Sequence, residues 1–499
     1  MKLAVVVQRY GRAINGGAEL HARYIAEHLA KHATVEVLTT CALDYVTWRN
    51  ELAAGVEEIN GVPVRRFRVN RERDPRVFGR RSDQVFERVH SLADELDWLA
   101  AEGPHTPALV EHLARKGAEY DYFFFFSYRY YHAYHGVRAT VPRAILVPTA
   151  EQDPAIGLAM FRPVFRGVRA LMYNSHEEQA MIHRVAGNED VPGVVVGIGS
   201  DIPQDSQAAR FRQKFEVHDP FAVYIGRIDQ NKGCDELFEF FQGYLRDPAG
   251  HLSLVLIGNS LLPIPAHPRI RHLGFLDDAD KFDAIAAADL LIMPSYFESL
   301  SMVALEAWAL GRPVLANGRC DVLKGQCNRS NAGLYYESHS EFLETLRAIE
   351  QNRWLNTALG KNGRQFFREH YDWPVIERKY LTMLERLAHL PAGNAIEPLP
   401  GWMERRRRNL PPATEVVARL TRGASVREHR DPTGRPEAGS GGGSIDLQPR
   451  QGLPEESRGR DDFASYEPGE QRPREATTRL DRPRREHRRS RRGRRGHRR

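Results

Sequence analysis

Residues 291–306 read Leu291-Ile292-Met293-Pro294-Ser295-Tyr296-Phe297-Glu298-Ser299-Leu300-Ser301-Met302-Val303-Ala304-Leu305-Glu306. An apolar strand ends at a proline, a short polar loop follows, and an apolar helix then begins. This order predicts one unit of a parallel sheet covered by helices, because parallel strands are usually joined through helical crossovers.

Two glutamates make this loop and helix a candidate site. Glu298 stands just before the helix, whose N-terminus presents unpaired amides and a partial positive charge to a diphosphate. Glu306 lies about two turns further on, in an apolar stretch where a carboxylate is costly unless it is paired or bound to hydroxyl groups. Sugar and ribose hydroxyls can donate to both carboxylates. The structural alternatives are a helix cap for Glu298 and a salt bridge for Glu306.

A second motif, Gly226-Arg227-Ile228-Asp229-Gln230-Asn231-Lys232-Gly233, follows an expected strand. Open parallel sheets bind ligands at the carboxyl ends of their strands, and Arg227 and Lys232 project from such an end. Together they could neutralise a pyrophosphate without a metal. Gly226 and Gly233 let the backbone come close to a ligand. The alternative is a solvated basic loop.

The alternation of apolar strands and amphipathic helices occurs twice along the chain, which predicts an α/β fold of two doubly wound, Rossmann-like domains facing a cleft. Strands are expected at Leu3–Gln8, Val35–Thr39, Tyr122–Ser127, Ala144–Pro148, Ala170–Asn174 and Val194–Val196, and then at Phe221–Ile225, Leu252–Ile257, Leu290–Met293 and Pro313–Ala316. Helices are expected at Ala18–Lys31, His176–Val185, Lys281–Ala288, Ser301–Leu310 and Trp373–Leu390, with a linker at 197–206.

The length of 499 residues suits two or three domains. Net charge is +6, but residues 482–499 alone contribute +10, so the rest of the chain is slightly acidic. The Gly/Arg-rich stretch 392–499 is expected to be largely disordered, apart from a short helical patch at Glu415–Leu420. Its basic end could attract a polyanion or an anionic membrane surface, or could simply be solvated. No specific nucleic-acid partner is expected.

Four cysteines, Cys41, Cys234, Cys320 and Cys327, have no metal-ligand spacing, so free thiols are expected. No apolar run approaches the roughly 18 residues of a membrane span, and the N-terminus resembles a buried strand more than a signal peptide. We therefore expect a cytoplasmic protein, peripheral at most at the inner membrane face.

These motifs, together with Gly274-Phe275-Leu276, resemble the retaining glycosyltransferases of group 1 (glycosyltransferase family 4), which have the GT-B fold. The resemblance covers roughly residues 1–390. It implies an acceptor-side domain over 1–200, completed by a crossing helix at 373–391, and a nucleotide-sugar domain over 201–372.

The resemblance also implies roles for individual residues. Arg227 and Lys232 would hold the donor diphosphate, Glu298 the hydroxyls of the transferred sugar, and Glu306 the ribose; the first three form the catalytic set. The remaining donor-binding candidates are Ser299, Leu300 and Ser301 through their amides, Gly226 and Gly258 in the pocket, Phe275 and Leu276 beside the base, and the glycine loop of Gly16 and Gly17.

On the acceptor side, Tyr128 and Arg129 follow an expected strand, where aromatic faces suit sugar stacking. Family members often carry a histidine after the strand that ends here at Pro148, and it contacts the transferred sugar. This sequence has Glu151-Gln152-Asp153 instead. Glu151 or Asp153 could replace the histidine, or the pocket could be altered.

The implied activity is retaining transfer of a sugar from a nucleotide-diphosphate donor to a glycan, a lipid-linked acceptor or a small molecule, without a metal or a cofactor. The leaving diphosphate would itself help to deprotonate the acceptor, and the protein would supply positioning and charge stabilisation. Alternatives are a nucleotide-sugar epimerase or phosphorylase on the same fold, or a polyanion-binding protein that acts through the Arg-rich end.

Overall fold

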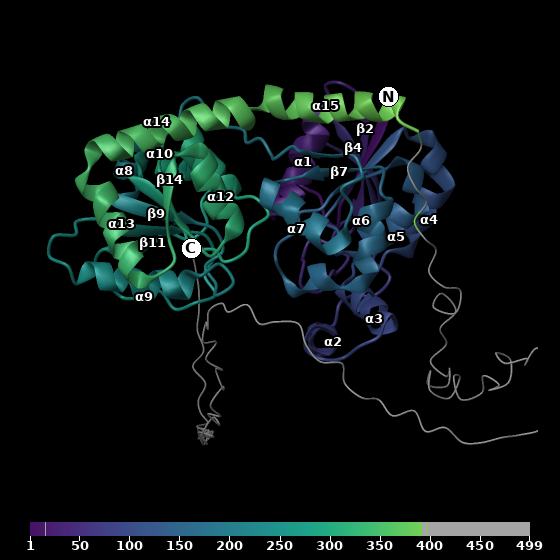
Figure 1. The fold of residues 1–499 in the computed structure, drawn as a ribbon, viewed down its shortest axis with the longest axis horizontal. Helices are drawn as coiled ribbons and strands as arrows, with labels where there is room; N and C mark the ends of the chain where they lie inside the picture. The colour runs from purple at the N-terminus through teal and green to yellow at the C-terminus, as the bar shows by residue number, and fades with distance from the viewer. Residues whose placement is uncertain (15, 392–395, 397–499) are drawn as a thin grey trace, which may run out of the picture. The chain divides into compact units, whose positions relative to one another are not determined.

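Eight strands of the first half form one sheet in the computed structural model, which describes residues 1–14, 16–391 and 396 (Figure 1). Their order across the sheet is β3-β4-β2-β1-β5-β6-β7-β8. All neighbours are parallel except β3 and β4, which form an antiparallel hairpin. The strands are β1 (Lys2–Val6), β2 (Thr34–Thr40), β3 (Gly55–Ile59), β4 (Val62–Phe67), β5 (Tyr122–Phe126), β6 (Ala144–Val147), β7 (Ala170–Tyr173) and β8 (Gly193–Val195).

Helices cover both faces of this sheet, because successive side chains of a strand point to opposite faces. Leu3 and Val5 of β1 belong to one apolar cluster with Ile25, whereas Ala4 and Val6 belong to another with Leu113. The helices are α1 (Gly17–Leu29), α2 (Pro75–Glu87), α3 (Leu92–Glu102), α4 (Pro107–Lys116), α5 (Tyr131–Ala139), α6 (Arg162–Gly167) and α7 (His176–Ala186), with short 3₁₀ turns η1 (Gly117–Glu119), η2 (Val141–Arg143), η3 (Pro154–Gly157) and η4 (Ala159–Phe161).

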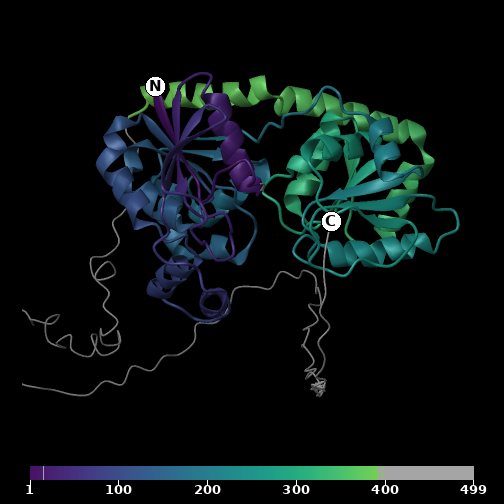
Figure 2. The same cartoon turned by 180° about the vertical axis from the view of Figure 1, so that it is seen from behind.

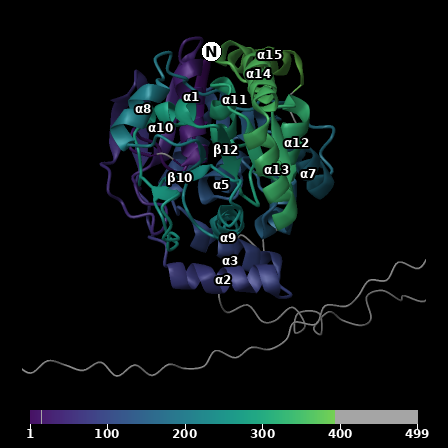
Figure 3. The ribbon, with the colours of Figure 1, turned by 90° about the vertical axis from the view of Figure 1, so that its left-hand side faces the viewer.

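Helices α2 and α3 lie side by side, as Figure 3 shows. The ring of Trp98 on α3 packs against Phe78 and Phe86 of α2, with centroids 6.2 and 5.6 Å apart. No element was expected from the sequence between residues 40 and 121, so this helix pair, α4 and the β3–β4 hairpin were missed.

Six strands of the second half form an all-parallel sheet with the order β11-β10-β9-β12-β13-β14. They are β9 (Phe221–Ile225), β10 (Ser253–Ile257), β11 (Ile270–His272), β12 (Leu290–Met293), β13 (Val314–Asn317) and β14 (Gly333–Tyr336). The helices are α8 (Ala208–Phe215), α9 (Cys234–Leu245), α10 (Asp278–Ala287), α11 (Met302–Ala309), α12 (Asp321–Ser330), α13 (His339–Gln351) and α14 (Arg353–His370).

The last described helix, α15 (Trp373–His389), follows α14 and packs against the first half (Figures 1 and 2). Tyr380 lies 5.6 Å from Phe124 of β5 between ring centroids, and the carboxylate of Glu377 lies 2.6 Å from Nδ1 of His28. The ring of Trp373 stacks on His28. Tertiary contact with the first half therefore stabilises α15 in addition to its own helical hydrogen bonds.

The predicted α/β class with two sheet-centred halves is confirmed, and every strand expected from the sequence is present within a residue or two. The four cysteines are buried and free. Among the described residues, no helix is long and apolar enough to cross a membrane. The expected disorder of 392–499 and the helical patch Glu415–Leu420 lie outside the described residues, apart from residue 396.

Candidate active site

A cavity of about 300 Å³ is lined by loops of both halves, and most of them follow the carboxyl ends of strands. This is the edge at which open parallel sheets bind ligands. The first half contributes Gln8, Gly17, Ala18, Glu19, His21, Ser127, Tyr128, Arg129, Tyr130, Thr149, Glu151, Asp153, Asn174 and Ile198, and the second half contributes Lys232, Glu298, Ser299, Leu300 and Met302.

The second half presents a lysine–glutamate pair to the cavity. Lys232 comes from the loop after β9, and its Nζ lies 2.7 Å from Oε1 of Glu298 in the loop after β12. Ser301 caps α11 by accepting a hydrogen bond from the amide of Ala304 at 3.2 Å. Because this cap fixes the first turn, the loop that carries Glu298 has a defined position at a helix N-terminus.

The charge state of the pair depends on a third residue, Glu151, which also lines the cavity. Burial alone would lower the pKa of Lys232, but the carboxylates of Glu298 and Glu151 raise it above its usual value. Burial raises the pKa of Glu151 to about 7, with Lys232 opposing and Glu298 adding to that shift. Glu151 can therefore hold or release a proton near neutral pH.

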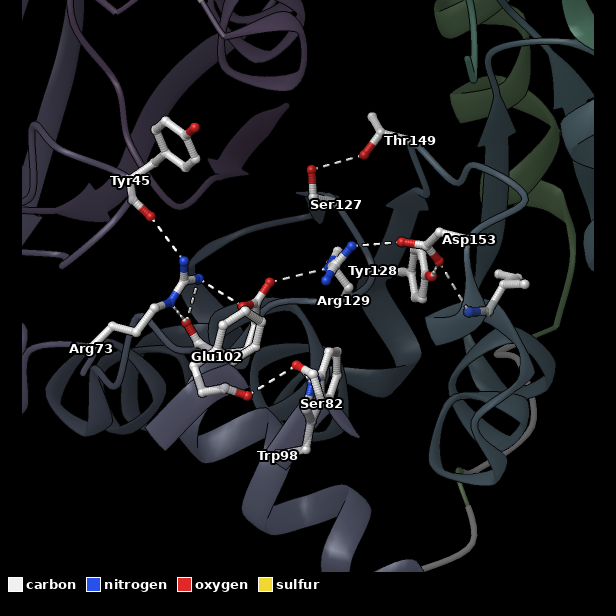
Figure 4. A network of polar contacts seen from close by, with 12 residues as sticks. Tyr45, Arg73, Ser82, Trp98, Glu102, Ser127, Tyr128, Arg129, Thr149 and Asp153 are labelled. Carbon is white, nitrogen blue, oxygen red and sulfur yellow. Dashed lines mark hydrogen bonds and ion pairs between the residues drawn. The ribbon is translucent and has the colours of Figure 1, made fainter. Parts of the chain in front are cut away.

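Two strained residues stand at the ends of neighbouring strands of the first half. Ser127 follows β5 with φ 64°, and Thr149 follows β6 with φ 47°. Residues other than glycine seldom adopt this left-handed backbone conformation. Their hydroxyl oxygens lie 2.8 Å apart (Figure 4). Strain of this kind costs roughly 1–3 kcal/mol per residue and is concentrated at functional sites.

Arg129, which lines the cavity, belongs to a network of polar and charged side chains (Figure 4). Its Nη1 lies 2.6 Å from Asp153, and its Nε lies 3.1 Å from Glu102. Glu102 in turn pairs with Arg73 at 2.7 Å, and the hydroxyl of Tyr128 donates to Asp153 at 3.2 Å. Each of these side chains is thus held by another, so this wall of the cavity is pre-organised.

The two loops after β6 and β7 are tied together by one buried carboxylate. Glu178, on α7, accepts hydrogen bonds from the amides of Ala150 and Asn174, both at 2.5 Å. Burial raises the pKa of Glu178 to about 8, although these hydrogen bonds oppose the shift. The side-chain amide of Asn174 also lies 3.4 Å from the hydroxyl of Ser299, which links the first half to the loop after β12.

Several residues predicted from the sequence line the cavity together: Lys232, Glu298, Ser299, Leu300, Gly17, Tyr128, Arg129, Glu151 and Asp153. Arg227 is not among the lining residues. It pairs with Asp229, two residues further on, and its Nη1 donates to the hydroxyl of Tyr45 at 3.2 Å.

Glu306 also lies outside the lining. Its side chain is 2% exposed, and Oε1 accepts from Ser200 at 2.9 Å and from Lys281 at 3.0 Å. This is the structural salt bridge that the sequence left open as an alternative. The lysine compensates the cost of burying the carboxylate.

The other donor-binding candidates, Gly16, Gly226, Gly258, Phe275, Leu276 and Ser301, are likewise absent from the lining. Two of them have a steric reason to be glycine. A Cβ on Gly258 would come within 1.9 Å of the carbonyl oxygen of Gly226, and both residues have positive φ angles. Phe275 is 61% exposed and therefore open to a ligand outside this cavity.

Sequence reasoning missed several polar lining residues, among them Gln8, Glu19, His21, Ser127, Thr149 and Asn174. A usable signal existed for four of them, because Gln8, Ser127, Thr149 and Asn174 each follow a buried parallel strand by one or two residues. The other two lie inside α1 and look like ordinary helix residues.

The sheet orders and this cavity between two α/β halves define the GT-B fold. Solved structures with the same fold include a sucrose-phosphate synthase from Thermosynechococcus elongatus, at 17% identity and TM-score 0.58 over 78% of this chain and 99% of that one. HepE of Anabaena, solved in complex with UDP-glucose, matches at 19% identity and TM-score 0.56 over 78% of this chain and all of that one.

Residues 205–366 match the family model described as Glycosyl transferases group 1. A D-inositol 3-phosphate glycosyltransferase from Corynebacterium efficiens is 28% identical over 41% of this chain and 53% of its own length, and a mannosylfructose-phosphate synthase from Agrobacterium fabrum is 23% identical over 38% and 45%. The chain thus spans about half the length of the curated relatives it matches. Over residues 205–366 the second half is thus similar to group 1 glycosyltransferases, the family that the sequence motifs resemble.

Proposed function

We propose that the chain transfers a sugar, with retention of configuration and without a metal, from a nucleotide-diphosphate sugar to a hydroxyl acceptor. The observation that carries this proposal is the cavity in which Lys232 and Glu298 meet polar strand-end residues of the first half. The group 1 domain supports it, and UDP-glucose, which HepE binds, is the first donor to test.

In this proposal the second half binds the donor. Lys232 stabilises the negative charge that develops on the diphosphate as the glycosidic bond breaks, and Arg227 assists once it turns from Asp229 to the phosphates. When the donor binds, the carboxylate of Glu298 releases Lys232 and accepts hydrogen bonds from hydroxyls of the transferred sugar. Glu306 is proposed to bind ribose beside its contact with Lys281. The backbone amides of residues 299–301, at the N-terminus of α11, donate hydrogen bonds to the donor.

The first half then positions the acceptor hydroxyl on the same side of the sugar as the departing diphosphate. Front-face attack of this kind needs no protein nucleophile, and the diphosphate takes the acceptor's proton. The division of the chain into an acceptor-side domain (1–200 with 373–391) and a donor domain (201–372) belongs to the same proposal.

The test begins with a thermal-shift screen of nucleotide sugars, because a specific donor raises the melting temperature by mass action. Transfer is then measured as release of nucleoside diphosphate. Lys232→Ala should lower kcat/KM by about 100-fold or more, the effect of removing one charge-stabilising group.

A matched control is Lys324→Ala, which removes a surface lysine paired with Glu337 at 2.6 Å and distant in sequence from the donor loops. The control should retain full activity, and both variants should melt as cooperatively as the wild type. Unaltered turnover in Lys232→Ala and Arg227→Ala would reject the proposed role of these cations.

A further inference from the structure

The charged residues that line the cavity are mostly acidic. Glu19, Glu151 and Asp153 come from the first half, and Glu298 comes from the second. Among the described residues, only two cations share this lining, Arg129 and Lys232. The acceptor side of the cavity is therefore rich in hydrogen-bond acceptors and poor in positive charge.

Both lining cations already have carboxylate partners. Arg129 contacts Asp153 at 2.6 Å and Glu102 at 3.1 Å, and Lys232 contacts Glu298 at 2.7 Å. In the proposed function the donor diphosphate takes Lys232, so an acceptor phosphate would have to use Arg129, displace one of its carboxylates and then lie beside it. Like charges at such a distance repel strongly at a site with little water.

Arg9, which does not line the cavity itself, is also paired with a carboxylate of the lining. Arg9 uses Nε and Nη2 for Glu19, at 2.9 and 2.7 Å, and Nη1 for the carbonyl of Leu43 at 2.7 Å. Burial lowers the pKa of His21 to about 3, so this lining histidine is neutral at physiological pH. In the described part of the first half, both Arg9 and Arg129 at this wall are thus already paired with carboxylates.

Two buried oxygens of the lining lack a hydrogen-bond donor. Within residues 1–14, 16–391 and 396, Oε1 of Gln8 and Oδ1 of Asn174 have no hydrogen-bond partner, and these two residues are 1% and 3% exposed. A buried acceptor without a donor is costly, and a ligand hydroxyl removes that cost. A phosphate oxygen cannot do so, because a phosphate at neutral pH has mainly acceptor oxygens.

We propose that the acceptor is an uncharged, hydroxyl-rich molecule, a free sugar or polyol, whose hydroxyls donate to Gln8, Asn174 and the carboxylates of the first half. A phosphorylated acceptor is disfavoured, because Lys232 is taken by the donor diphosphate and the other lining cation, Arg129, is paired with two carboxylates. This inference rests on the proposed function, since it names the second substrate of the same cavity.

The experiment compares matched pairs of acceptors with the full chain and the donor found by the thermal-shift screen. The pairs are glucose with glucose 6-phosphate and myo-inositol with inositol 1-phosphate. Product is identified by mass spectrometry and nucleoside diphosphate release is timed. We expect kcat/KM for the uncharged member of an accepted pair to exceed that of the phosphorylated member by at least about tenfold.

Asp153→Asn tests the electrostatic reason. The asparagine keeps an oxygen for the hydroxyl of Tyr128 but removes one of the two carboxylates that pair with Arg129, so the preference for the uncharged acceptor should shrink at least about fivefold. Glu19→Gln, which frees Arg9, should act in the same direction and serves if Asp153→Asn does not fold. Glu337→Gln removes a surface carboxylate paired with Lys324 and should leave the preference unchanged.

A preference for the phosphorylated member in the wild type overturns the inference. So does the absence of transfer to every uncharged sugar and polyol while the donor still binds. Failure of the proposed function has a different signature, because then no nucleotide sugar raises the melting temperature at all.

Discussion

The two halves fix the loops at the ends of their strands by different means. The second half uses backbone: the loops after β9 and β10 touch so closely that a Cβ on Gly258 would fall 1.9 Å from the carbonyl oxygen of Gly226. The first half uses side chains, because Arg129, Asp153 and Glu102 hold one another in place. By contrast, a Cβ on Gly17 in the first half would meet nothing within 4 Å.

This difference explains which half can be recognised from sequence. Close backbone contacts require glycine at fixed positions, so they leave a motif, and the group 1 family model matches residues 205–366. A network of side chains can be built from many residue combinations at scattered positions, and it leaves no comparable pattern. Each of the predictions that follow tests one side of this contrast.

The largest expected effect is that of Gly258→Ala. Gly258 has φ 134°, and the added methyl would collide with backbone that cannot move aside. Strain and overpacking together should lower the free energy of unfolding by roughly 4 kcal/mol. Urea denaturation followed by circular dichroism measures this loss, provided that the variant still folds.

Gly17→Ala is the matched substitution in the first half. The methyl meets open space and replaces glycine at the start of α1, so stability should be unchanged or slightly higher. Because Gly17 lines the cavity, transfer should nevertheless fall severalfold. Equal destabilisation by the two alanines would refute the contrast between the halves.

The same contrast explains how much of the fold and of the candidate site could be predicted from the sequence. Ten of the fourteen described strands were found because they are short apolar runs between polar loops, whereas β3, β4, β11 and β14 were missed. Lys232 and Glu298 were found because they follow two of the predicted strands. Helix α2 was missed because Val85 is its only buried residue, so its apolar stripe is weak. The ion pair between Arg227 and Asp229 could not be predicted, because a side chain on a loop can turn either to a bound diphosphate or to a neighbouring carboxylate. Gln8 and Asn174 are single polar residues, and only the assembled sheet brings them together.

Glu306 is an exception in the second half, because a side-chain pair and not backbone holds it. Lys281→Met would leave this carboxylate, 2% exposed, with the hydroxyl of Ser200 as its hydrogen-bond donor. Loss of one member of a buried pair should cost about 3 kcal/mol. Lys232→Met should cost less, about 1 kcal/mol, because Glu298 is more exposed, at 11% of its side chain.

Differential scanning calorimetry of both variants at one pH checks this order. The double variant Lys281→Met/Glu306→Met should regain part of the lost stability, because it leaves no buried charge without a partner. Melting of Lys281→Met at the temperature of the wild type would mean that water or Ser200 alone satisfies the carboxylate.

In the first half, the buried carboxylate of Glu151 lowers the stability of the folded chain above neutral pH. Burial raises its pKa to about 7 in the folded chain, above the ordinary value of 4.5 that it regains on unfolding. The folded state therefore holds the proton more tightly. The contribution of Glu151 to stability is unchanged below about pH 4.5, declines as pH rises toward 7, and is lost fully above that.

Glu151→Gln carries no titrating proton, so it should match the wild type near pH 5 and exceed it by about 1–2 kcal/mol at pH 8.5. Glu178, whose pKa is raised to about 8, titrates in both proteins and largely cancels in the difference. Urea denaturation at these two pH values measures the effect.

Lys232 faces Glu151 and lowers its pKa, so adding Lys232→Met to both proteins should enlarge the stability difference between them at pH 8.5. A gap that is the same at both pH values would show that the carboxylate of Glu151 is not the source, and that the glutamine stabilises the fold by packing alone.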